Sequence, residues 1–561
     1  EEQRMVGQMA ETFADKEVRP HIEEMEAGDH AVTVRLLREA GKLGLLGATV
    51  PEAYGGQGLS KVTTALILEK LARAGSFVIS YGAHNGIGTL PVVLFGNEEQ
   101  KARYLPAMAS GDKLSCFALT EPDAGSDAMS IRTTARLSPD GRTYRLNGQK
   151  QWITNAGFAD LFVVHAKVDG ERMTAFIVER GFQGVSVGPE HRKMGLHGTS
   201  TCDVFLSDAS VPVGNVLGEV GKGHLVAFNT LNFGRWKIAA GCMGSCKLVL
   251  EECARYAQER RQFGRPIAQF PVIQQKLAQM AARTYAIESA VYRLSDLFDQ
   301  ALASLEAGDV EGGAARAVGE YMVEASICKV LGSEAMVFAA DEGVQIHGGY
   351  GYMHGFEVER AYRDVRVKRI FEGTSEINRL VIAGTILRRA SRGELPLAQG
   401  FQRAQSGAIT SAAEGTPLAA ETASLSNLKR AALLLAGLGA QKYAGRVEEE
   451  QEFLLALGDL AILAFAWESA LLRARALQQR SRSEAMVAAE LARLLGEWTL
   501  EQAETTTRRA LAGMERGDAL EGHLSLVGRL FKRPPLDTVA LGRRLAQRVL
   551  AAVGYTLAAT E

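Results

Sequence analysis

Four short segments of the chain combine turns that glycine permits with polar groups in apolar surroundings, as a small-molecule site requires. Residues 119–127, Leu-Thr-Glu-Pro-Asp-Ala-Gly-Ser-Asp, predict a tight loop that exposes backbone N–H groups and hydroxyls. Residues 151–155, Gln-Trp-Ile-Thr-Asn, place an aromatic ring beside a hydroxyl donor. Each segment alone is also compatible with an ordinary turn, so the argument depends on their joint occurrence and order.

The other two segments contain charged residues. Residues 259–264, Glu-Arg-Arg-Gln-Phe-Gly, predict a basic helix end followed by a turn, which suits a pyrophosphate. Residues 345–352, Gln-Ile-His-Gly-Gly-Tyr-Gly-Tyr, lead to 369–378, Arg-Ile-Phe-Glu-Gly-Thr-Ser-Glu-Ile-Asn. There Gly373 permits a turn directly after the Glu372 carboxylate. The alternative is that Glu372 is an exposed helix-capping carboxylate, since Gly-Thr-Ser follows it.

The elements that position these segments change along the chain. Helical periodicity over 1–111 gives way to short β-branched and aromatic runs, and long helices then return. This order predicts an α+β fold that is mostly α, and it argues against a Rossmann fold, whose strands alternate with helices. The expected divisions are an N-terminal helical domain (1–111), a small β-barrel or sandwich (112–220), a helical bundle (221–390), a linker or mobile loop (391–424) and a C-terminal helical extension (425–561).

The composition excludes several classes of function. The 561 residues carry a formal net charge of -2, so nothing indicates nucleic acid or another polyanion as a partner. The six cysteines form no CxxC pair, and we interpret them as core residues rather than metal ligands. The most apolar stretch, 453–472, contains Asp459 and Glu468 and therefore predicts a buried helix rather than a membrane span.

Together and in this order, the four segments resemble the acyl-CoA dehydrogenase family over residues 1 to about 390. The resemblance is tightest to its very-long-chain branch. That branch has a segment similar to 82–88, Gly-Ala-His-Asn-Gly-Ile-Gly, and a motif like 231–235, Leu-Asn-Phe-Gly-Arg. It also carries a C-terminal helical extension, which 425–561 matches by length and helical character. The resemblance implies a helical domain, a β-barrel and a helical bundle, with FAD between barrel and bundle.

The resemblance also assigns roles by position in the motifs. Thr120 and the loop to Ser126 should hold the flavin and the thioester end of the substrate. Trp152 should pack beside the isoalloxazine, with Thr154 donating toward its N5. Arg260, Gln262 and Phe263 should be offered to the FAD of a partner subunit, which implies at least a dimer. The remaining implied contacts are Gln345, Gly348, Gly349, Thr374 and Glu376 for FAD, and Asn232, Arg235 and Gly373 for the substrate.

The implied reaction desaturates an acyl-CoA thioester, and its base is implied to be Glu372. A carboxylate can remove a weakly acidic α-proton only if the thioester carbonyl is strongly polarised. In the family, the backbone N–H of the base and a ribityl hydroxyl of FAD polarise it, and FAD accepts the β-hydride. Another family layout places the base next to the arginine of 231–235, but Gly234 stands there and cannot act as one. Arg235 should hold the Glu372 segment, or it forms a plain structural salt bridge.

Substrate length is inferred from small residues. Gly82, Gly86, Gly88 and Gly234 would border the acyl cavity, and small walls favour long-chain acyl-CoA. In the resembling branch the extension closes the tetramer face, which leaves a dimer. The loop there meets membranes, but 391–424 has no basic amphipathic pattern, so contact with a membrane surface is an open idea here.

Two other readings stay open at this point. An acyl-CoA oxidase on the same fold would reduce oxygen, where a dehydrogenase passes electrons to an electron-transfer flavoprotein. A mainly non-catalytic assembly factor would keep the fold, although an intact Glu372, Thr154 and Arg260 argue against a decayed site. With no apolar leader visible in 1–19, a bacterial cytoplasmic location is expected, or the mitochondrial matrix if a leader has been removed.

Overall fold

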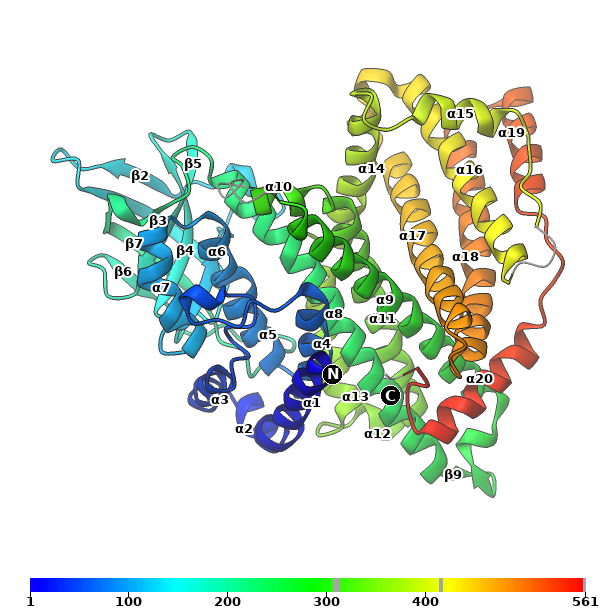
Figure 1. Cartoon of the computed structure of the whole chain (residues 1–561), viewed down its shortest axis with the longest axis horizontal. Coiled ribbons are helices and arrows are strands. Elements are labelled where there is room, and N and C mark those ends of the chain that lie inside the picture. Colours follow the sequence, from blue (N-terminus) through cyan, green and yellow to red (C-terminus); the bar gives the residue numbers. More distant parts are fainter. Residues whose placement is uncertain (306–312, 413–416, 558–561) are drawn as a thin grey trace. The chain divides into compact units, whose positions relative to one another are not determined.

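The computed structural model describes residues 1–305, 313–412 and 417–557, and the chain divides into two compact units (Figure 1). Unit 1 contains Glu1–Gly244, Ser295–Tyr321 and Arg366–Lys368, and unit 2 contains Ser245–Leu294, Met322–Val365 and Arg369–Glu561. Two long helices, α8 (Gly223–Glu259) and α9 (Pro271–Ala303), each run from one unit into the other. Helices dominate both units, as the sequence predicted.

The first part of unit 1 is helical, as predicted for 1–111. Helix α7 shows how local sequence sets the boundaries: Asn97 and Gln100 form a capping box at its start, and Gly111, with φ +82°, ends it. The helices of unit 1 besides α8 and α9 are α1 (Glu2–Phe13), α2 (Ile22–Glu26), α3 (His30–Lys42), α4 (Lys61–Leu71), α5 (Phe77–Gly82) with the π-helix η5 (Ala83–Gly88), α6 (Leu90–Phe95), α7 (Glu98–Ser110) and α10 (Gly313–Gly319).

The middle of unit 1 is an eight-stranded sheet of order β6-β7-β3-β2-β4-β5-β8, with β1 paired to β4. Its strands are β1 (Ser115–Ala118), β2 (Thr134–Leu137), β3 (Thr143–Thr154), β4 (Leu161–Val168), β5 (Arg172–Glu179), β6 (Val185–Val187), β7 (Thr201–Pro212) and β8 (Val216–Leu217). Along β4, Phe162 and Val164 enter one buried cluster whereas Leu161 and Val163 enter another, because successive side chains point to opposite faces. Both faces of this strand are therefore buried.

Unit 2 is a helical bundle with a helical extension. Helices α14, α16, α17 and α18 run side by side along the extension (Figure 1). The elements of unit 2 besides α8 and α9 are the hairpin strands β9 (Arg261–Gln262) and β10 (Arg265–Pro266), and the helices α11 (Met322–His347), α12 (Gly349–Tyr352), α13 (Glu357–Val365), α14 (Ser375–Ser391), α15 (Leu397–Gln405), α16 (Ala419–Tyr443), α17 (Gln451–Gln479), α18 (Ala485–Met514), α19 (Gly517–Leu530) and α20 (Thr538–Ala552).

The segment 391–424 differs from the predicted linker. It contains α15, and its last residues already belong to α16; residues 413–416 lie outside the described residues. Helix α15 was missed because it has only nine residues and buries only Phe401 and Ala404, so its apolar face is very short. The segment therefore includes an ordered helix.

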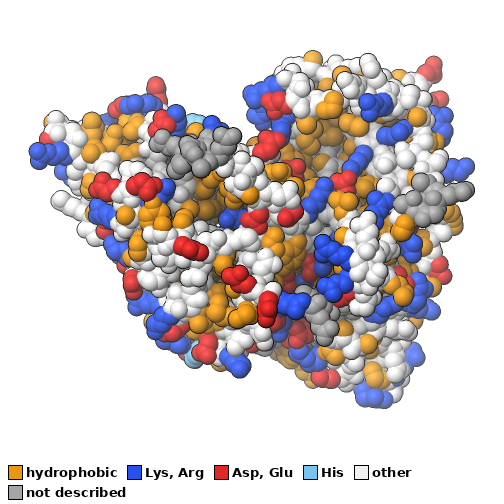
Figure 2. Space-filling model, in the orientation of Figure 1, with side chains coloured by type: hydrophobic (Ala, Val, Ile, Leu, Met, Phe, Trp, Pro, Cys, Tyr) orange, Lys and Arg blue, Asp and Glu red, His pale blue; other side chains and the backbone are white. Residues whose placement is uncertain are grey.

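The apolar stretch around 453–472 lies in α17, which is long and apolar enough to cross a membrane by length and composition alone. In the described structure 61% of its most apolar window is buried inside the protein, and core helices of soluble proteins pass the same test. All six cysteines are buried, and the described residues contain no group of three or more His, Cys, Asp and Glu that could hold a metal ion. On the visible face, positive and negative side chains are interspersed (Figure 2).

Candidate active site

The loop 119–127 lies in unit 1 and is tied directly to β3. The amide of Gln151 donates to the carbonyl of Thr120 at 2.9 Å, so the two segments singled out from the sequence are neighbours. Ser126 and Gly125 at the loop tip are exposed, and a Cβ on Gly125 would meet no heavy atom of the described residues within 4 Å. The loop therefore presents an open surface on which a ligand can lie.

An irregularity in β3 exposes the tryptophan. The register with β7 shifts between Lys150 and Ile153, and Trp152 has a φ of +57°. A bulge of this kind re-aims a side chain, and the indole of Trp152 is 60% exposed. Thr154 ends the same strand and is half-buried. The strand thus offers an aromatic face and a hydroxyl at its end, as the sequence predicted.

A buried ion pair that the sequence did not reveal lies beneath these two segments. Lys150 Nζ donates to Glu121 Oε1 at 2.7 Å and to the Leu119 carbonyl at 3.2 Å. Glu121 also accepts from the Thr133 amide at 3.0 Å and from the Arg132 amide at 2.5 Å. Burial lowers the pKa of Lys150 to about 8, although the charge of Glu121 opposes the shift. The pair fixes the loop against the strand.

Replacing Lys150 with methionine should loosen this loop, because the carboxylate of Glu121 would stay buried without its cation. Removing one partner of a buried pair costs about 3–5 kcal/mol of stability. We expect a lower melting temperature and a lower ratio of flavin absorbance to protein absorbance after purification. The control is Lys167→Met on strand β4 of the same sheet, where the side chain is half-buried. Full flavin content and an unchanged melting temperature in Lys150→Met would contradict the anchoring role.

The predicted substrate residues of α8 lie in unit 1. Arg235 Nη1 donates to Asn232 Oδ1 at 3.1 Å, and both side chains are buried. The two residues stand three apart on one helix, so this contact fixes the guanidinium along the helix surface. This contact tests neither of the two roles predicted for Arg235, and both stay predictions.

The predicted pyrophosphate segment of unit 2 forms a tight hairpin at the end of α8. Strands β9 and β10 are joined by Phe263 and Gly264, whose φ values of +48° and +78° match the two-residue hairpin turn that favours glycine. Phe263 is 92% exposed. Its delivery to the FAD of a partner subunit stays a prediction.

A hollow of about 490 Å³ in unit 2 unites two of the sequence segments. Four of the predicted cofactor residues line it, namely Arg260, Gln262, Gly348 and Gly349, while Gln345 stands exposed nearby on α11. Gly348 has a φ of +59°, and a Cβ on Gly348 would meet no described heavy atom within 4 Å. An accessible backbone beside a guanidinium can bind a pyrophosphate, so these residues fit the pyrophosphate of FAD.

Sequence reasoning missed the aromatic residues of this hollow. Tyr256 stacks on His347 with ring centroids 4.1 Å apart, and the Arg260 guanidinium lies over the Tyr350 ring at 5.5 Å. Burial lowers the pKa of His347, which keeps its ring neutral. The sequence carried one signal for Tyr256. It stands one helical turn before Arg260, so the two side chains are expected on the same face of the helix.

The segment of Glu372 begins helix α14 in unit 2. Thr374 is its N-cap, and its Oγ1 accepts from the Ile377 amide at 3.1 Å. Glu372 itself precedes the helix and is half-buried, so it is not the exposed capping carboxylate of the alternative interpretation. Glu376 is exposed in the first turn, and a hydrogen bond from its own backbone amide lowers the pKa of its carboxyl, helped by Thr374.

The backbone at Glu372 is unusual. Glu372 has a φ of +55° and Gly373 a φ of +83°, so two consecutive residues are left-handed. For a non-glycine residue this conformation costs about 1–3 kcal/mol and persists only where the surroundings enforce it, which is most often at functional sites. The strain falls on the residue that the sequence proposed as the base.

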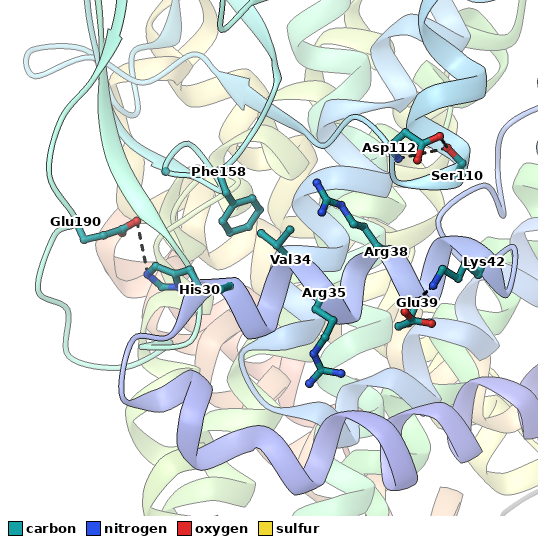
Figure 3. Close-up of a pocket in the computed structure, with 12 residues that line it drawn as sticks. His30, Val34, Arg35, Arg38, Glu39, Lys42, Ser110, Asp112, Phe158 and Glu190 are labelled. Atoms are coloured by element: carbon teal, nitrogen blue, oxygen red, sulfur yellow. Dashed lines mark hydrogen bonds and ion pairs between the residues drawn. The ribbon is translucent and has the colours of Figure 1, made fainter.

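A second hollow, of about 690 Å³, lies in unit 1 along α3 and holds none of the predicted site residues (Figure 3). Several of its charges pair with one another: His30 lies 3.6 Å from Glu190, and Lys42 lies 2.8 Å from Glu39. We therefore do not assign this hollow to the active site.

Comparisons with known proteins agree with this arrangement. Family models of the acyl-CoA dehydrogenase N-terminal domain, middle domain and C-terminal domain match residues 1–112, 116–209 and 221–387, and a further acyl-CoA dehydrogenase C-terminal domain matches 427–529. A probable acyl-CoA dehydrogenase of Bacillus subtilis is 47% identical over 99% of this chain and 95% of its own. The human very long-chain specific acyl-CoA dehydrogenase is 43% identical over 61% of this chain and 51% of its own.

A solved structure extends the likeness to the whole fold. The acyl-CoA dehydrogenase of Bacillus anthracis, solved in complex with FAD, is 48% identical, covers 99% of this chain and 96% of its own, and superposes with a TM-score of 0.97. The resemblance inferred from four segments is confirmed, and the extension also belongs to it. The chain is therefore a member of the acyl-CoA dehydrogenase family and an FAD-dependent oxidoreductase.

Proposed function

We propose that this enzyme desaturates long-chain acyl-CoA thioesters in fatty-acid β-oxidation, with Glu372 as its base and an electron-transfer flavoprotein as its electron acceptor. The observation that carries the proposal is the left-handed turn at Glu372 and Gly373 directly before α14. A carboxylate held there by an imposed backbone can accept an α-proton at a fixed place. When bound, FAD supplies the acceptor for the β-hydride.

The residues of this chain would divide the remaining work. The loop 119–127 and Trp152 offer the surface on which the flavin and the thioester lie. The backbone N–H of Glu372 would polarise the thioester carbonyl while its carboxylate takes the proton. Exclusion of water by the bound substrate would raise the pKa of this carboxyl and bring it toward that of the activated proton.

A dimer follows from the same proposal. Phe263 projects from its hairpin with 92% of its surface exposed, and Arg260 and Gln262 line the hollow beside it. These residues would complete the FAD site of a second copy of the chain. Light scattering on the flavin-loaded protein measures its mass and so tests whether it is a dimer.

The glycines expected to border the acyl cavity support the preference for long acyl chains only in part. A Cβ on Gly82 would meet no described heavy atom within 4 Å, so this position leaves space. In contrast, a Cβ on Gly88 would lie 2.4 Å from Ser115 Oγ, and the Gly86 position is filled by the stem of Lys237 at 3.2 Å. Gly88 thus serves close packing rather than cavity volume. The long-chain proposal depends on Gly82 and on the likeness to the human very long-chain enzyme.

Anaerobic titration of the yellow protein with butyryl-, octanoyl- and palmitoyl-CoA tests the length class. We expect palmitoyl-CoA to bleach the flavin absorbance at lower concentrations and faster than butyryl-CoA. Equal or better reduction by butyryl-CoA would overturn the long-chain proposal. In air, fast peroxide formation during turnover would identify an oxidase and overturn the proposed acceptor. A protein purified without flavin would favour the non-catalytic alternative.

A further inference from the structure

Two donors hold the carbonyl that follows the proposed base. Lys329 Nζ donates to the Gly373 carbonyl at 2.6 Å, and Asn378 Nδ2 donates to the same oxygen at 2.8 Å. Asn378 Nδ2 also lies 2.9 Å from the Thr374 carbonyl and 3.4 Å from the Glu372 carbonyl. Both donor side chains are fully buried. Every peptide carbonyl from Glu372 to Thr374 therefore faces one of two buried side chains.

The helix that carries Lys329 is locked to the helix that follows the base. Arg379 on α14 forms a two-pronged ion pair with Glu334 on α11, at 2.8 and 2.9 Å. Its Nε donates to Asp459 on α17 at 2.7 Å. Because Glu334 stands five residues after Lys329 on α11, this pair sets the register in which the Lys329 ammonium meets the Gly373 carbonyl. The contact is thus built by the bundle rather than by the loop alone.

The conformation of this turn controls two chemical groups at once. The side chain and the backbone N–H of Glu372 lie on either side of its N–Cα bond, so a rotation about φ moves the proton acceptor relative to the carbonyl-polarising donor. Relaxation from φ +55° toward the common negative values would change this relative placement. A misplacement of about 1 Å at a reacting group can slow a reaction about 100-fold.

We propose that Lys329 is a positioning residue for the base: its buried ammonium holds the Gly373 carbonyl and so keeps Glu372 in its left-handed conformation. The inference rests on the proposed role of Glu372 and adds the group that maintains it. In this role Lys329 does not touch the reacting atoms. It acts through the peptide between Gly373 and Thr374.

The test compares Lys329→Met with Lys247→Met. Methionine keeps the length of the stem and removes the donor. Lys247 is the matched control, a lysine of the same bundle that donates to Glu288 at 2.6 Å and takes no part in the Glu372 turn. We expect Lys329→Met to keep FAD and acyl-CoA binding and to slow flavin reduction in anaerobic stopped-flow by about 10- to 100-fold. Lys247→Met should melt earlier but reduce its flavin at the rate of the unmodified enzyme.

An isotope effect separates positioning from a general loss of packing. With acyl-CoA deuterated at the α-carbon, the ratio of light to heavy reduction rates should rise in Lys329→Met, because proton removal becomes more limiting. Restoring a donor with Lys329→Arg should recover part of the rate. Flavin reduction by Lys329→Met at the unmodified rate, or equal losses in both methionine variants with an unchanged isotope effect, would overturn the inference.

The outcome is separable from a failure of the proposed function. If Glu372→Gln still reduces its flavin, the base is another group and both proposals fall. If Glu372→Gln is inactive and Lys329→Met matches the unmodified enzyme, only the positioning role fails. The assay uses whichever acyl-CoA bleaches the unmodified enzyme fastest, so an error in the chain-length proposal does not affect it.

Discussion

Flavin reduction by acyl-CoA should nearly stop when Glu372 is replaced by glutamine, while FAD stays bound. Glutamine keeps the size of the side chain and the backbone N–H, but its amide accepts no proton at neutral pH. A positioned general base contributes about 10²- to 10⁴-fold to a rate, and we expect a loss in this range or larger. Anaerobic stopped-flow that follows the flavin absorbance would measure this rate.

The control for this experiment is Glu394→Gln. Glu394 follows α14, is exposed, and pairs with Arg389 at 3.1 Å, so its loss should leave the reduction rate unchanged. Binding of acyl-CoA to Glu372→Gln, seen as a perturbed flavin spectrum without bleaching, would show that the substrate still arrives. Reduction of this variant at a rate near that of the unmodified enzyme would refute the assignment of the base.

The sequence predicted the elements whose signals are local. The glycine and proline of 119–127, the β-branched runs of 112–220 and the helical periodicity of the bundle each act within a few residues, and the structure contains all three. The turn after the basic helix end was likewise predicted, and the structure adds the short strands β9 and β10 that this turn joins. Local signals therefore predicted the segments, while the roles of their residues in the site stay predictions.

The groups that hold those pieces were not predictable in the same way. Lys150 meets a carboxylate 29 residues away, and Lys329 meets a carbonyl 44 residues away. From the sequence alone each lysine is expected at the surface, because lysine is almost never fully buried unless it is paired. The left-handed φ of Glu372 has no signal of its own either, since the residue type does not favour it. Such features depend on tertiary contacts and appear only in the fold.

A buried carboxylate links the C-terminal extension to the bundle. Glu288 on α9 accepts from Lys247 Nζ on α8 and from the Tyr555 hydroxyl, each at 2.6 Å, and it also pairs with Arg473 on α17. Burial by itself would raise the pKa of Glu288, but the charges of Arg473 and Lys247 outweigh it and hold the pKa well below its ordinary value. One side chain thus links two bundle helices, an extension helix and the last described residues.

Replacing Glu288 with glutamine should destabilise the protein strongly at neutral pH, because two partly buried cations would lose their shared, fully buried anion. Breaking a buried ion pair in this way costs about 3–5 kcal/mol, whereas an exposed pair is worth about 0–1 kcal/mol. The matched control is Glu504→Gln on α18, which removes a partly exposed partner of Arg508. Thermal unfolding should show a fall of several degrees for Glu288→Gln and almost none for Glu504→Gln.

The pH dependence identifies the charge as the cause. The folded pKa of Glu288 is depressed below the ordinary carboxyl value of 4.5, so its contribution is fully present above that pH and is lost as the pH falls toward the folded pKa. The gap in melting temperature between the unmodified enzyme and Glu288→Gln should therefore be constant from neutral pH down to about 4.5 and narrow below it. A gap that does not change with acidification would mean that glutamine fails for reasons of packing. In that case the extension would be held by its apolar contacts, and the carboxylate would serve only to fill its place.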